Sequence, residues 1–79
     1  MIYLVRKQYR LRLFNDSDIE VSDVVAICQE LNNADLVFQS QKPVVYNEHI
    51  VTGAKSILLI LEAYDLETGK TQCLKEFHS

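Results

Sequence analysis

The sequence lacks the long apolar run that a membrane-spanning helix requires, since no window of about 18 residues is continuously apolar. The N-terminus, MIYLVRKQYR, is apolar first and basic afterwards, which is the reverse of a secretory signal. Cysteine is scarce, and Cys28 and Cys73 are far apart, so without an export signal both are expected to be free thiols in a reducing compartment. The sequence therefore predicts a cytoplasmic protein without a membrane segment.

Glycine is also rare, which argues against nucleotide binding. The segment Gly53-Ala54-Lys55-Ser56 is similar to the end of a phosphate-binding loop, but such a loop needs several glycines so that backbone N–H groups can wrap the phosphates. Possible metal ligands are Cys28, His49, Cys73 and His78, and no two of them have the spacing of a zinc finger. Neither a cofactor nor a metal is expected.

The 79 residues have no linker, repeat or low-complexity segment, which predicts a single domain over residues 1–79. A net charge of −3 does not suggest nucleic-acid binding. Charge is unevenly spread, because residues 1–14 contain no acid and residues 15–41 contain no base. This pattern is typical of a solvated strand followed by a helix with an acidic outer face, or of an acidic docking surface for a basic partner.

Hydrophobic periodicity predicts a strand and then a helix in the first half of the chain. Alternating apolar residues favour a strand that is clearest at 8–14. Apolar residues then recur at helical spacing, which favours a helix with the apolar stripe Val21, Val24, Val25, Cys28 and Leu31. Ser17 or Asp18 is expected to cap this helix, and Asn32-Asn33 to end it.

The second half is predicted to contain three strands and a helix. Residues 36–38 are expected to form a short strand. One of the β-prone pieces 44–46 and 49–51, or both with a kink, is expected to form the third strand, which Gly53 closes. The apolar run 57–61 favours a helix capped by Ser56. The alternative is a strand that pairs with 71–77 across a turn at 67–70. Residues 71–77 are predicted to be the last strand in either case.

The predicted order is β-α-β-β-α-β, with a four-stranded, mostly antiparallel sheet and helices on one face. This is an α+β open-faced sandwich.

The run VTGAKSILLILEAYDL is similar to the segment around the regulatory serine of HPr, the histidine-containing phosphocarrier family of the bacterial sugar phosphotransferase system. Ser56 matches that serine, and Lys55 and Ile57 match its neighbours. The predicted stripe that begins at Val21 also resembles the family's first helix in spacing. The resemblance implies an HPr-like fold, with Ser56 and Lys55 as a candidate phosphorylation or regulatory site.

The sequence departs from that family at its phosphorylated histidine. When the predicted helix is aligned with the family's first helix by their apolar stripes, Ser17 takes the place of the phosphorylated histidine. Residues 1–48 contain no histidine. Phosphoryl relay through an imidazole needs a ring nitrogen with a pKa near neutrality, which serine does not supply. The family's final helix is missing as well. We therefore expect a divergent, short member that does not carry phosphohistidine.

The function that the sequence favours is a non-catalytic, HPr-like binding or regulatory module that acts through protein contacts. Its partner would be a protein such as a kinase or a regulator, and Ser56 at a helix N-terminus would carry the signal. The alternatives are a phosphocarrier-type component of a sugar phosphotransferase system and a self-associating structural domain. A homo-oligomer through the sheet or its edge is expected, because a thin domain without the last helix leaves apolar strand surface uncovered.

Overall fold

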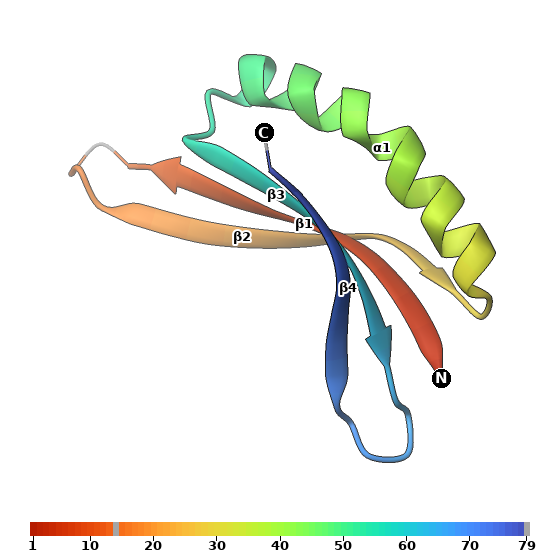
Figure 1. Cartoon of the computed structure of the whole chain (residues 1–79). Coiled ribbons are helices and arrows are strands. Elements are labelled where there is room, and N and C mark those ends of the chain that lie inside the picture. Colours follow the sequence, from red (N-terminus) through yellow and green to blue (C-terminus); the bar gives the residue numbers. More distant parts are fainter. Residues whose placement is uncertain (14, 79) are drawn as a thin grey trace.

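The computed structural model describes residues 1–13 and 15–78 of the chain. In chain order, its elements are β1 (Ile2–Arg12), β2 (Asp18–Cys28), α1 (Leu31–Thr52), β3 (Ser56–Tyr64) and β4 (Thr71–His78). The strands form one antiparallel sheet in the order β2-β1-β3-β4, and α1 crosses one face of it (Figure 1).

The α+β class, the four-stranded antiparallel sheet and the helical cover on one face are confirmed. The predicted order β-α-β-β-α-β is wrong, because the chain runs β-β-α-β-β. The β-α-β-β-α-β topology implied by the resemblance to HPr is therefore not present, and that resemblance rests on the residues around Ser56 alone.

The predicted helix with the Val21 stripe is in fact strand β2, which pairs with β1 along its whole length. A β-bulge explains the misleading spacing. Val5 faces Ala26 while Arg6 faces Val24, so Val25 is an extra residue in the ladder. An extra residue interrupts the two-residue alternation of a strand and produces apolar spacings of three and four, which imitate a helix.

The segments predicted as the second and third strands lie together in one helix, α1. Short β-prone runs such as 44–46 favoured strands locally, and Pro43 suggested a turn. The helix is nevertheless held by long-range packing, because Ala34, Phe38 and Val45 are buried against the sheet. Tertiary burial of one narrow stripe therefore overrides local propensity here.

The apolar run that was expected to form a helix after Ser56 is the central strand β3. The hairpin alternative is confirmed, since β3 pairs with β4 around the turn at 65–70. Asp65 accepts a backbone hydrogen bond of 2.8 Å from Gly69, whose φ of +71° suits glycine. β3 has a neighbouring strand on each side, and Leu59, Ile60 and Leu61 are buried in succession. Its apolar residues therefore lack the alternation that identifies a half-exposed strand.

A second bulge lies on the other side of the sheet. Leu61 faces Lys75 while Glu62 faces Cys73, so Leu74 is the extra residue in β4. Both bulges are therefore in the outer strands of the sheet.

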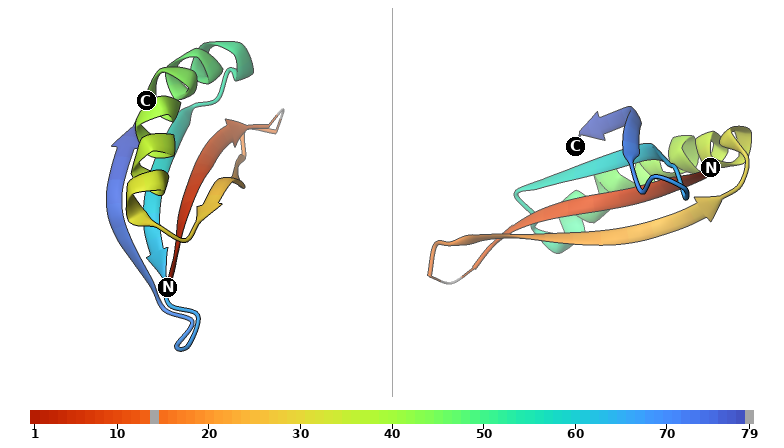
Figure 2. Two further views of the ribbon diagram at one scale, coloured as in Figure 1. Left: turned by 90° about the vertical axis from the view of Figure 1, so that its right-hand side faces the viewer. Right: turned by 90° about the horizontal axis from the view of Figure 1, so that it is seen from below.

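The hydrophobic core lies between α1 and the inner strands β1 and β3. Its largest fully buried side chains are Phe38, Ile57, Leu59, Leu61, Val5 and Val45. The molecule is thin, with a shortest extent of 14 Å, and two views at right angles show two layers (Figure 2). None of the described helices and strands covers the far face of the sheet. Gly53, predicted to close a strand, instead ends α1 with a left-handed φ of +65°.

Candidate functional site

Ser56 lies at the first position of β3 and not at the N-terminus of a helix. It is exposed, and its partner in the ladder is Arg10 of β1. Because a strand begins here, no free N–H groups of a first helical turn are present for the serine to cap. The predicted capping role of Ser56 is therefore wrong.

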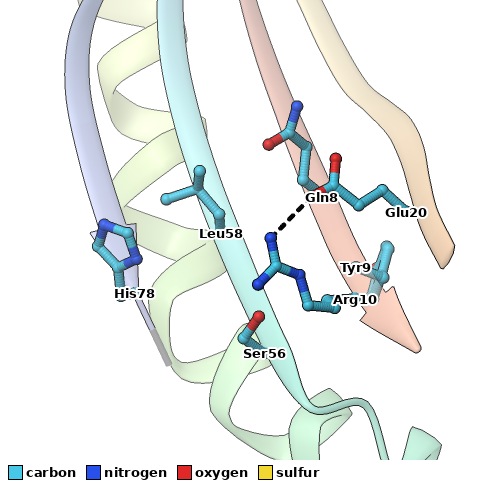
Figure 3. A pocket seen from close by; sticks show the side chains of 7 residues that line it. All are labelled: Gln8, Tyr9, Arg10, Glu20, Ser56, Leu58 and His78. Carbon is cyan, nitrogen blue, oxygen red and sulfur yellow. Dashed lines mark hydrogen bonds and ion pairs between the residues drawn. The ribbon is translucent and has the colours of Figure 1, made fainter. Parts of the chain in front are cut away.

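Ser56 lines a shallow hollow on the sheet face that α1 leaves open (Figure 3). The other lining residues are Gln8, Tyr9, Arg10, Glu20, Leu58 and His78. Arg10 donates a hydrogen bond of 2.9 Å to Glu20, and this bond raises the pKa of the guanidinium group. The hollow measures about 220 Å³, which is below the usual size of a small-molecule pocket. Its arginine already has a partner, so the hollow has few features of a ligand site.

Lys55 and Ser17 lie at the same end of the sheet. Lys55 places its ammonium group 3.2 Å from the carboxylate of Asp18, and that hydrogen bond lowers the pKa of Asp18. Ser17 is in the turn between β1 and β2, where its hydroxyl donates to Asn15 at 2.6 Å. Lys55 is thus paired with Asp18, the residue that follows Ser17. Ser17 itself precedes strand β2 and not the helix predicted there.

The described residues contain no familiar catalytic or metal-binding arrangement. Ser56 and His78 line the same hollow, yet within residues 1–13 and 15–78 no hydrogen bond joins them, and His78 lies 3.6 Å from Glu76. In the same residues, no cluster of three His, Cys, Asp or Glu side chains is placed to hold a metal ion. Cys28 and Cys73 are free thiols. The part of the chain that the structure describes has no helix long and apolar enough to span a membrane.

The outward surface of α1 is unusual for a helix on the outside of a small domain. We define the outer face as the exposed residues Asn32, Asn33, Leu36, Gln39, Ser40, Pro43, Tyr46, Asn47, Ile50 and Val51. Their large apolar side chains are well exposed, at 69% for Leu36, 68% for Ile50 and 84% for Val51. None of the ten residues carries a charge, so this face can be buried without desolvating an ion.

The charged groups of α1 point instead toward the sheet or its edge. Asp35 accepts a hydrogen bond of 2.7 Å from Lys75 of β4, and this bond lowers the pKa of Asp35. The ammonium group of Lys42 lies 5.4 Å from the ring centre of Phe38 and 5.5 Å from that of Phe77. Surface helices normally place charge outward and apolar groups inward, so α1 shows a partial reversal of that pattern.

Glu48 completes this inward set of charges. Its carboxylate accepts hydrogen bonds from Lys7 and Tyr9, which both project from β1 toward the helix. These bonds lower the pKa of Glu48, Lys7 first and Tyr9 second. The pKa of Tyr9 is raised, mainly by burial and then by its bond to Glu48. The cluster fixes α1 to the sheet in one rotational setting, and that setting turns Leu36 and Ile50 to solvent.

The outer face was not predicted from the sequence, because residues 36–38, 44–46 and 49–51 were expected to lie in strands. One signal was present in the sequence. Leu36, Pro43 and Ile50 recur every seven residues, which places them on one side of a helix. Proline in the middle of that series concealed it, because proline is normally read as a helix breaker.

No protein-family model, no curated protein and no solved structure matches this chain significantly.

Proposed function

We propose that this chain is a non-catalytic protein-binding module whose contact surface is the outer face of α1. The observation that carries the proposal is the absence of charge from that face combined with the exposure of Leu36, Tyr46, Ile50 and Val51. An exposed surface that combines large apolar side chains with uncharged polar ones is typical of a protein contact site.

A site-specific photo-crosslinker in living cells tests the proposal. The reactive residue is introduced at Ile50 on the outer face and, as the matched control, at Ile27 on the open face of the sheet. The two isoleucines are similarly exposed, at 68% and 65%. We expect adducts with protein from position 50 and few from position 27. Equal or fewer adducts at position 50 would contradict a contact surface on α1.

A second candidate function is regulation through phosphorylation of Ser56, favoured by its exposure and by Arg10 directly across the ladder. A phosphoserine there would compete with Glu20 for the guanidinium group, which binds phosphate well in a bidentate manner. Incubation with a phosphorylating cell extract, followed by intact mass and site mapping, tests this. Phosphate on other residues and none on Ser56 would reject it.

A further inference from the structure

We propose that the partner of the outer face is a second copy of this chain, and that two copies of α1 pair antiparallel about a two-fold axis at Pro43. This inference rests on the proposed function and names the partner for the same surface. An isologous contact requires that residue i meets residue j while j meets i, so the surface must be complementary to itself. The outer face meets this requirement in its chemistry and in its spacing.

The spacing is symmetric about Pro43. Leu36 is seven residues before it and Ile50 is seven residues after it, and seven residues make nearly two helical turns. An antiparallel two-fold axis at Pro43 therefore sets Leu36 of one copy against Ile50 of the other, twice. The apolar ends of the stripe then cover each other, and the proline ring lies at the centre of the contact.

The intervening residues are compatible with the same arrangement. Gln39 and Ser40 lie just before Pro43, and Tyr46 and Asn47 lie just after it, so the axis places the first pair of one copy opposite the second pair of the other. All four side chains are polar and uncharged, and each both donates and accepts hydrogen bonds. The hydroxyl of Ser40 already donates to the carbonyl of Val37 at 2.8 Å, which leaves its oxygen free to accept.

Charge and shape also suit a second copy. Like-charged copies of a chain with net charge −3 repel each other, but the outer face brings no charge into the contact. The nearest charges on α1 are turned toward the sheet, as for Glu48 with Lys7. The helix packs on one face of the sheet, and no other described element covers its outer side (Figure 2). Two copies would form a four-layer sandwich with the helices in the middle.

The contact is small, and small interfaces are typical of weak, transient association. A helix of 22 residues is about 33 Å long, and pairing along the outer face buries roughly 500 Å² on each copy. The total of roughly 1,000 Å² is at the lower limit for a specific interface. A dimer with a dissociation constant on the order of 10–100 µM is therefore expected, and not a permanent one.

Sedimentation equilibrium of the purified full chain over a wide concentration range provides the first test. We expect a monomer–dimer equilibrium, and we expect Leu36→Lys and Ile50→Glu each to weaken it at least tenfold. Ile27→Glu is the matched control, because it makes the same chemical change at a similarly exposed isoleucine on the open sheet face. Far-ultraviolet circular dichroism confirms that each variant is folded.

Mixing the two variants tests the orientation. In a mixed antiparallel dimer the introduced lysine faces the introduced glutamate, while the native leucine and isoleucine still meet at the other end. We therefore expect the mixture to dimerise at least fivefold more tightly than either variant alone. A parallel pairing would set position 36 against position 36, so recovery would then be strongest on mixing Leu36→Lys with Leu36→Glu, a pair for which the antiparallel arrangement predicts none.

Three results would overturn the inference: a monomer up to millimolar concentration, loss of dimer in Ile27→Glu but not in Ile50→Glu, or no recovery on mixing. The first result combined with crosslinks from position 50 to a different protein would reject self-pairing alone and leave the proposed function standing. An absence of crosslinks from position 50 would reject the proposed function as well.

Discussion

The ammonium group of Lys7, buried beneath α1, is paired with the carboxylate of Glu48. The side chain of Lys7 is only 6% exposed, whereas that of Glu48 is 27% exposed at the flank of the helix. The pair joins the second half of α1 to the middle of β1, and Tyr9 adds a second hydrogen bond to the same carboxylate. A buried charge without a partner is costly, so this contact makes one setting of α1 strongly preferred.

Removing the acid should therefore destabilise the fold. Glu48→Ala leaves the lysine charge buried and unpaired, and we expect a loss of about 2–3 kcal/mol in the free energy of unfolding. Asp35→Ala, which breaks the more exposed pair with Lys75, is the control and should cost much less. Urea denaturation measures both variants. Equal losses in the two would contradict the special position of the Lys7 pair.

The same carboxylate should make stability depend on pH in the acid range. Its hydrogen bonds from Lys7 and Tyr9 lower the pKa of Glu48 in the folded state below the ordinary value of 4.5. The stability from this group is therefore complete above about pH 4.5 and is lost as the pH falls through the folded-state pKa. Glu48→Gln lacks this titration, so its stability difference from the parent should shrink between pH 6 and pH 3. A difference that stays constant over that range would argue against the pairing.

Glycine should be needed at position 53 because of its left-handed backbone conformation, and not because a side chain there would collide with other atoms. Its φ is +65°, and an added Cβ would meet no atom within 4 Å. Gly53→Ala should therefore cost about 1 kcal/mol, the penalty for a left-handed residue that carries a side chain. Gly53→Asn should cost less, since asparagine tolerates this region better. Thermal unfolding of the three proteins shows the order, and an asparagine variant weaker than the alanine variant would contradict the explanation.

Ser56→Ala should leave stability almost unchanged. The serine is exposed at the beginning of a strand and caps no helix, so we expect a change within about 0.5 kcal/mol. Ser56→Val, with its higher preference for strands, should be equal or slightly better. Guanidinium denaturation compares the three. A loss above about 1 kcal/mol in the alanine variant would mean that the hydroxyl has a structural role.

The parts of the fold that the sequence predicted are those whose pattern is local and regular. Tyr9, Leu11 and Leu13 alternate without interruption, and the run from Thr71 to Phe77 begins after a clear turn, so β1 and β4 were located. The predicted number of four strands also agrees with the structure, but the predicted strands at 36–38 and within 44–51 lie in α1, and β2 and β3 take their place.

The missed elements are those in which long-range contacts decide the structure. Val25 is an extra residue that only the pairing with β1 explains, and Leu58–Leu61 is apolar throughout because β3 is central. Residues 31–52 form a helix although their apolar residues lie on two opposite sides, one against the sheet and one toward solvent. No single-face pattern can reveal such a helix. The candidate contact surface was missed for the same reason, and the capping role predicted for Ser56 failed because residues 57–64 form a strand.

The two bulges have a consequence for how copies of this molecule can stack. Val25 and Leu74, the extra residues of the two edge strands, lie at the same level of the sheet, because Val5 and Leu61 beside them are ladder partners. At each edge the free N–H and C=O groups therefore form two short rows, and the register of one row is shifted relative to the other by the extra residue. A regular strand laid along either edge loses its register halfway, so neither edge is a template for amyloid-like growth, even though both are uncovered.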